Sequence, residues 1–227
     1  MLVTSFAAPA FGTNCWILAT GAGEECIVID PGMPDVTPQI EQVTARFGLK
    51  PIAALITHGH LDHTFSIFPL CEGYGIPAYI HYEDRELLTH PSKALSPQFS
   101  ESVKDMEFFE PTDLRIIKSG ENLSIAGLDF RAIHAPGHTR GSMIFLFGEE
   151  ILVSGDVLFA GSIGRTDLPS GSAEDMEKTL EKRILPLPDA MRVLPGHGRE
   201  STIGQERMTN PYLQKYIKPG QKRSGKF

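Results

Sequence analysis

The 227-residue chain has few cysteines and no long apolar run. Its three cysteines, Cys15, Cys26 and Cys71, include no Cys-x-x-Cys pair, so we expect no disulfide framework and a reducing compartment. No stretch approaches the roughly 18 apolar residues of a membrane helix, and no basic region with an apolar run opens the sequence. These absences predict a cytoplasmic protein with no membrane span and no signal peptide.

Positive charge is also scarce, with 21 Lys and Arg residues against 28 Asp and Glu residues and a net charge of -7. This balance leaves no broad basic surface, so nucleic acid and anionic membranes are not expected as partners. The sequence contains no Gly-x-Ser-x-Gly elbow, no His-Glu-x-x-His pair and no phosphate loop ending in Gly-Lys-Ser/Thr. These absences exclude the serine-hydrolase and NTPase classes.

Strand and helix patterns alternate along the chain. Apolar runs and period-two patterns predict strands at 14–19, 25–30, 52–56, 78–81, 114–118, 123–125, 128–134, 142–147, 151–154 and 192–194. Helical spacing predicts helices at 36–47, 61–74, 82–89, 173–184 and 205–216. The polar, Pro-bearing segment 90–111 is expected to be a long loop or a small helical excursion. Polar residues follow strand ends in both halves, which favours a layered α/β sandwich.

The most informative segment is Thr57-His58-Gly59-His60-Leu61-Asp62-His63, which directly follows an apolar strand. Imidazole and carboxylate groups suit zinc, iron and manganese, and four of them at this spacing can serve two neighbouring metals. Four ligands do not complete two sites, so further His and Asp residues are predicted at later strand ends. Three such residues follow predicted strands and lie beside a glycine that permits a tight turn: His138, Asp156 and His197.

This pattern of seven residues resembles the metallo-β-lactamase superfamily over roughly residues 12 to 200. The resemblance implies an α/β fold, a four-layered αββα sandwich. It implies one catalytic domain at 1–200, with 201–227 as a short C-terminal helix and basic tail and not a separate domain. It also implies two divalent metal ions, zinc first, with iron or manganese as alternatives. The implied ligands are His58, His60 and His138 for one metal, Asp62, His63 and His197 for the other, and Asp156 for both.

Several supporting roles are expected around this centre. Asp62 is predicted to be catalytic as well as a ligand, because it can orient a hydroxide or move its proton. Thr57 or Thr139 is expected to form hydrogen bonds with ligands. His134 is interpreted as a strand-end residue and not as an eighth ligand, and His81 and His90 as structural or surface residues.

The run Ser154–Phe159 and the following Gly161-Ser162-Ile163-Gly164-Arg165-Thr166-Asp167 resemble the glyoxalase II group, the hydroxyacylglutathione hydrolases, and especially its compact bacterial members. This resemblance implies a hydrolase that cleaves S-(2-hydroxyacyl) thiol esters, small-molecule substrates, with hydroxide held by the metals. Arg165 would bind the thiol portion of the substrate. The alternative interpretation of Arg165 is a residue that forms a salt bridge on the surface. Only 30 residues follow His197, whereas full-length members carry a helical C-terminal domain, so Lys215 and Lys218 are predicted to help bind the thiol portion.

Other functions remain open at this level. A mononuclear Fe(II) persulfide dioxygenase needs only two histidines and one carboxylate, for which His58, His138 and Asp156 suffice. That family resembles the chain at Gly-Arg-Thr-Asp 164–167 as well. A flavodiiron role is disfavoured because that group has Glu at the position of His60 and carries a flavin domain. A non-catalytic metal-binding module, a lactonase and a β-lactamase would use the same ligands. The oligomeric state is not predicted.

Overall fold

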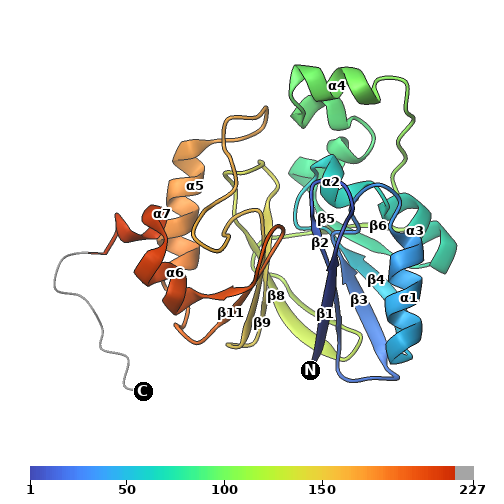
Figure 1. Cartoon of the computed structure of the whole chain (residues 1–227), viewed down its shortest axis with the longest axis horizontal. Helices are drawn as coiled ribbons and strands as arrows, with labels where there is room; N and C mark the ends of the chain where they lie inside the picture. The colour runs from blue at the N-terminus through green and yellow to red at the C-terminus, as the bar shows by residue number, and fades with distance from the viewer. Residues whose placement is uncertain (218–227) are drawn as a thin grey trace.

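The computed structural model describes residues 1–217 and contains two six-stranded sheets packed face to face, with helices on both outer surfaces (Figure 1). The first sheet has the order β1 (Leu2–Ala7), β2 (Asn14–Ala19), β3 (Glu25–Ile29), β4 (Lys50–Leu55), β5 (Ala78–His81) and β6 (Leu114–Ile117). The second has the order β12 (Ser201–Thr202), β11 (Arg192–Pro195), β10 (Ile151–Gly155), β9 (Met143–Phe147), β8 (Leu128–His134) and β7 (Asn122–Ile125). The predicted αββα sandwich is confirmed.

Three apolar cores hold these layers together. The core between the sheets includes Trp16 and Leu55 from the first sheet and Phe145 and Leu194 from the second. A second core lies under the helices of the first sheet and a third under those of the second. The covering helices are α1 (Thr37–Phe47) and α3 (Ile67–Tyr74) on the first sheet, and α5 (Ala173–Thr179), α6 (Ile203–Thr209) and α7 (Pro211–Gln214) on the second (Figure 1). Strands β2 and β10 are buried at every residue, as their continuous apolar runs indicate.

Two of the predicted helices are broken in the structure. The helix predicted at 61–74 divides into α2 (Leu61–Thr64) and α3, because the chain turns at Ser66. The Ser66 hydroxyl donates to the Gly32 carbonyl at 2.6 Å and accepts from the Val36 amide at 2.8 Å. The helix predicted at 205–216 divides into α6 and α7 at Asn210, since Pro211 has no amide proton with which to continue α6.

The remaining differences lie in short elements. The predicted helix at 173–184 ends in a π-helical turn, η3 (Leu180–Ile184). Segment 90–111 contains η2 (Pro91–Ala94) and α4 (Pro97–Val103), which follow the short helix η1 (Tyr82–Leu88). Strands β1 and β12 were not predicted. Within residues 1–217, none of the helices is both long enough and apolar enough to cross a membrane.

The topology brings four strand ends to one edge of the sandwich. Residues 57–63 follow β4 of the first sheet, and α2 carries the last of them (Figure 1). Residues 135–142 follow β8, Asp156 follows β10 and residues 196–198 follow β11, all in the second sheet. Strands β10 and β11 are parallel, so their carboxyl ends lie side by side. Polar residues that are far apart in sequence therefore meet between the two sheets.

Candidate metal centre

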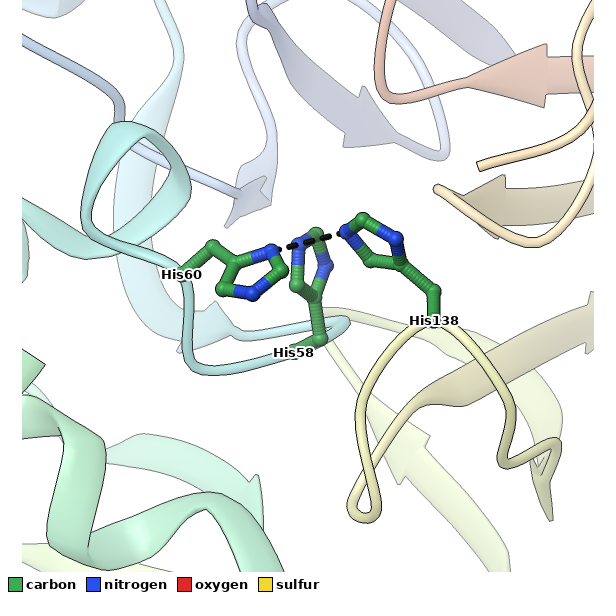
Figure 2. A group of neighbouring side chains, drawn as sticks. All are labelled: His58, His60 and His138. Atoms are coloured by element: carbon green, nitrogen blue, oxygen red, sulfur yellow. Dashed lines mark hydrogen bonds between the residues drawn. The ribbon is translucent and has the colours of Figure 1, made fainter. Parts of the chain in front are cut away.

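Seven His and Asp side chains gather at this edge in three overlapping groups. Each group has ligand atoms within 4.8 Å of one another, and the groups are His58, His60 and His138; His58, His63 and Asp156; and Asp62, His63 and His197. Figure 2 shows the first group, in which His58 and His60 come from one loop and His138 from the facing loop. The Nδ1 atom of His60 lies 2.8 Å from Nε2 of His138. The structure therefore brings together all seven residues that the sequence singled out.

Some buried polar atoms of this cluster have no hydrogen-bond partner within the described residues. They are Nε2 of His58, Nε2 of His60 and Oδ1 of Asp156. Burying a polar atom without a partner costs free energy, so such atoms indicate a ligand. Imidazole nitrogens and carboxylate oxygens at these separations suit divalent cations such as zinc or iron. The residues present thus fit a two-metal site. Asp156 lies between a first triad, His58, His60 and His138, and a second triad, Asp62, His63 and His197.

Oxygen atoms behind the cluster orient the histidine rings. The Nδ1 atoms of three ligand histidines face acceptors: His63 faces Asp30 Oδ2 at 3.0 Å, His138 faces the Arg165 carbonyl at 2.7 Å, and His197 faces the Phe11 carbonyl at 3.2 Å. An acceptor at Nδ1 holds the proton there and leaves Nε2 with a free lone pair. These three rings therefore present Nε2 as the ligand atom.

Asp30, at the end of β3, is a supporting residue that the sequence analysis did not identify. Its carboxylate is buried and accepts from the Thr57 amide at 2.8 Å, the Thr57 hydroxyl at 2.6 Å and His63. The Thr57 hydroxyl also lies 3.1 Å from Nδ1 of His58. Because the one proton of this hydroxyl goes to Asp30, Thr57 accepts a hydrogen bond from His58, and Asp30 holds Thr57 in place beside this ligand. The position of Asp30 directly after a buried strand is a signal in the sequence that could have identified it.

Asp84, in η1, joins the two ligand-bearing loops. Its buried carboxylate accepts from the Gly59 amide at 2.8 Å, the Thr139 hydroxyl at 2.6 Å and the Gly141 amide at 2.7 Å. Gly59 lies between His58 and His60, whereas Thr139 and Gly141 follow His138. Thr139 thus supports the loop, and its hydroxyl bonds to Asp84 and Ser142. No sequence pattern indicated Asp84.

The first residues of β2 hold the third ligand-bearing segment. The Asn14 side chain donates to the carbonyls of Pro195 at 3.0 Å and Gly198 at 2.8 Å, on either side of His197. The Trp16 indole donates to the Pro195 carbonyl at 2.9 Å. The Thr13 hydroxyl donates to Asp62 Oδ2 at 2.9 Å. The N-terminal segment therefore positions ligands from both sheets.

The two triads differ in their protonation in the metal-free protein. Burial and the neighbouring histidines lower the pKa of His58, and burial lowers the pKa of His60 to about 3, so both rings are neutral. Burial opposes the charged form of His63, but Asp156 and Asp62 outweigh it and raise its pKa. Hydrogen bonds to Asp156 and Asp62 likewise overcome burial and raise the pKa of His197 to about 9. His63 and His197 therefore hold protons where His58 and His60 do not.

The two aspartates of the cluster are ionised. Burial would raise the pKa of Asp62 and of Asp156, but the His63 charge and the hydrogen bond with His197 lower both. The negative charges of these two carboxylates are thus balanced by the positive charges of His63 and His197 before metal binds. A second metal must displace the protons of His63 and His197, because only neutral imidazole is a ligand.

The predicted substrate-binding residues lie on the exposed surface or outside the described residues. The Arg165 guanidinium makes two hydrogen bonds to Asp167, at 2.8 and 2.7 Å, while its backbone carbonyl faces His138. The Lys215 ammonium pairs with Glu177 of α5 at 2.6 Å. Lys218 lies outside the described residues. The substrate-binding roles of all three residues stay predictions.

His134, at the end of β8, is absent from the three groups of ligand atoms. Its ring stacks on that of His81, with centroids 4.2 Å apart, and its Nε2 lies 2.7 Å from the Arg140 carbonyl. This arrangement agrees with the strand-end role expected of His134.

Comparison with known proteins identifies the family of this chain. Residues 8–197 match the family model of the metallo-beta-lactamase superfamily. The chain belongs to this superfamily. Among its relatives is the hydroxyacylglutathione hydrolase GloC of Haemophilus influenzae, 33% identical over 205 residues that cover 90% of this chain and 94% of the relative. The resemblance seen in the sequence is thus confirmed at the level of the superfamily.

Two solved structures of similar sequence share the fold. BLEG-1, described as a B3 metallo-beta-lactamase, is 33% identical with a TM-score of 0.81, covering 93% of this chain and 99% of that one. TTHA1623, solved in a di-iron-bound form, is 31% identical with a TM-score of 0.76, and the match covers 94% of this chain and 100% of that one. The chain is a metal-dependent hydrolase of the metallo-beta-lactamase superfamily.

Proposed function

We propose that this hydrolase uses two metal ions to cleave small-molecule thioesters, specifically S-(2-hydroxyacyl) thiol esters. The observation that carries the proposal is the pair of complete triads joined by Asp156, with buried ligand atoms that have no other partner. The GloC relative, named a hydroxyacylglutathione hydrolase, supports the substrate class. The net charge of -7 supports a small-molecule substrate over nucleic acid or an anionic membrane.

His58, His60 and His138 would hold one metal, Asp62, His63 and His197 the other, and Asp156 both. When bound, such a pair supplies a Lewis acid for the substrate carbonyl and a water whose pKa falls to about 7. We propose zinc, with iron as the alternative that the di-iron form of TTHA1623 supports. No side chain of the cluster needs to act as a nucleophile.

Asp62 is proposed as the residue that orients the attacking water by accepting a hydrogen bond from it. The Asp62 side chain is 21% exposed, whereas that of Asp156 is 8% exposed, so Asp62 is the more accessible carboxylate. Its Oδ2 atom already accepts from the Thr13 hydroxyl, which fixes one side of the carboxylate. The lowered pKa keeps Asp62 ionised and able to accept a hydrogen bond.

Arg165 is proposed to bind the thiol arm of the substrate, with Lys215 and Lys218 contributing. The Arg165–Asp167 pair is exposed, and such pairs contribute little free energy. A substrate carboxylate therefore competes with Asp167 at small cost. The Arg165 backbone lies against His138, which places the residue beside the centre.

The test is metal content by elemental analysis together with anaerobic turnover of S-lactoylglutathione. We expect about two metals per chain, as in paired-metal sites, and oxygen-independent release of glutathione. His58→Ala should abolish turnover, whereas His90→Ala, which changes a histidine outside the cluster, should not. One iron per chain, no thioester cleavage, and oxygen uptake on glutathione persulfide would overturn the proposal in favour of the persulfide dioxygenase.

A further inference from the structure

Glu206 of α6 is a fully buried carboxylate outside the metal centre. Its Oε2 accepts from the Gly161 amide at 2.7 Å and from the Asn210 side chain at 3.0 Å, and its Oε1 accepts from the Ser201 hydroxyl. A buried carboxylate is costly unless its oxygens are hydrogen-bonded, and here both are. Asn210 lies between α6 and α7 and Ser201 belongs to β12, but Gly161 belongs to the loop that follows Asp156.

Asn210 lies four residues after Glu206 and contacts the same loop. Its side-chain amide donates to the Ser162 carbonyl at 2.9 Å and lies 3.4 Å from that of Phe159, while its Oδ1 accepts from the Tyr212 amide at 3.0 Å. Asn210 is also fully buried. Together Glu206 and Asn210 bind the loop through both backbone donors and backbone acceptors, which fixes its position and its direction.

The segment that continues from this anchor packs directly on the candidate metal ligands. The Gly164 amide donates to the Asp156 carbonyl at 3.0 Å. The carbonyl of the following residue, Arg165, lies 2.7 Å from Nδ1 of His138. A side chain at position 164 would meet His138 Nδ1 at 2.9 Å, so only glycine allows this approach. Near the start of the loop, the Phe159 ring meets the His197 ring edge-on, with centroids 5.9 Å apart.

We propose that Glu206 and Asn210 are positioning residues that hold loop 159–165 against His138, Asp156 and His197. Through this loop the two C-terminal helices fix the ring of His138 and the starting point of the Arg165 side chain. This role needs the hydrogen-bond acceptor at Glu206 Oε2 and the donor at Asn210, and it does not need a charge. The kinetic consequence rests on the proposed thioesterase function, whereas the loop and metal consequences do not.

Three variants separate this role from a general effect on folding. Glu206→Met keeps the length of the side chain but removes both acceptors. Glu206→Gln keeps an amide oxygen for Gly161 and Asn210 and an amide nitrogen for Ser201. Ser201→Ala is the matched control, because it removes only the contact of Oε1, the oxygen that does not touch the loop.

The measurements use zinc-loaded full-length protein. Hydrogen exchange is followed by mass spectrometry on peptides covering residues 157–166, and zinc release is followed with a chromogenic chelator. We expect the Glu206→Met loop to exchange faster and zinc to leave about tenfold faster, the scale of losses seen when a ligand's supporting contact is removed. Glu206→Gln and Ser201→Ala should stay within about twofold of the parent, since their loop contacts remain. In active protein, the KM for S-lactoylglutathione should rise more than kcat falls.

The proposal fails if folded Glu206→Met shows parental loop exchange, or if Ser201→Ala opens the loop to the same extent. If Glu206→Met does not fold, Asn210→Ala is the variant that tests the proposal. It removes the donor to the Ser162 carbonyl and leaves Glu206 bonded to the Gly161 amide. Parental exchange and zinc release in Asn210→Ala would then overturn the proposal. A parent protein that is inactive on S-lactoylglutathione refutes the proposed function alone, since loop exchange and zinc release are measured without substrate.

Discussion

The substitution Asp30→Asn should weaken the second metal site while leaving the fold intact. Asp30 has a φ of 52°, a left-handed conformation that Asn adopts as readily as Asp. Asn can keep Oδ1 as the acceptor for the Thr57 amide. Its amide nitrogen would then replace Oδ2, the atom that faces Nδ1 of His63 at 3.0 Å.

This replacement acts on the tautomer of His63. Facing an N–H donor, Nδ1 must become an acceptor, so the single proton of the neutral ring moves to Nε2, the atom that faces Asp62 and Asp156. Metal binding then requires the other tautomer and breaks the new hydrogen bond. The metal-bound variant also lacks the hydrogen bond from His63 to the charged Asp30 carboxylate. The loss of such a bond costs about 1.5–3 kcal/mol, which corresponds to a loss of affinity of about 10–150-fold.

The assay is competition between the metal-free protein and a chelator of known affinity, which resolves two successive dissociation constants. We expect the weaker one to increase by about 10–100-fold, as for other supporting contacts of ligand histidines. Asp113→Asn, at an exposed carboxylate that pairs with Arg115, is the control and should change neither constant. A second dissociation constant within about twofold of the parent value would show that Asp30 does not set the His63 tautomer.

Three further outcomes are expected. His197→Ala should reduce metal content from two ions per chain toward one, and His90→Ala should not; elemental analysis after dialysis checks this, and equal metal content in both variants contradicts it. Affinity at the second site should rise with pH up to about 9, where His197 loses its proton, and should fall about tenfold per unit below that value for each proton displaced. Competition titrations at three pH values test this slope, and a flat profile would refute it. Asp84→Ala should lower the free energy of unfolding of the metal-free protein by about 2–4 kcal/mol, because three donors lose their acceptor; exposed Glu83→Ala is the control in urea titrations, and equal midpoints would count against the role of Asp84.

The identity of the candidate ligands could be predicted because they follow strands whose local pattern is strong. An apolar strand followed by His-x-His-x-Asp-His places four ligands, three imidazoles and one carboxylate, within six residues, and such spacing is informative without any tertiary contact. The later ligands His138, Asp156 and His197 were individually weak signals. They became informative only as a set, because two metals need more ligands than one loop supplies.

The break in the helix predicted at 61–74 has a partly tertiary origin. Apolar spacing over 61–74 is continuous, but Pro69 has no amide proton to bond the Phe65 carbonyl, so a break before Pro69 had a local signal. The exact place of the break also depends on Ser66, whose side chain is held by the Gly32 carbonyl and the Val36 amide, about 30 residues earlier in the chain. Such contacts exist only when the segments are already packed together, so helical periodicity alone does not reveal them.

Local sequence therefore determined the class of fold and the chemistry of the centre, since strand periodicity and ligand identity are properties of short segments. Only the tertiary structure decided which oxygen stands behind each ring, that Asp84 joins the ligand loops, and that Glu206 and Asn210 anchor the loop beside His138. These are hydrogen bonds between residues distant in sequence, and their donors and acceptors are common residue types. What selects them is burial, because a polar group removed from water must find its partner wherever the fold places one.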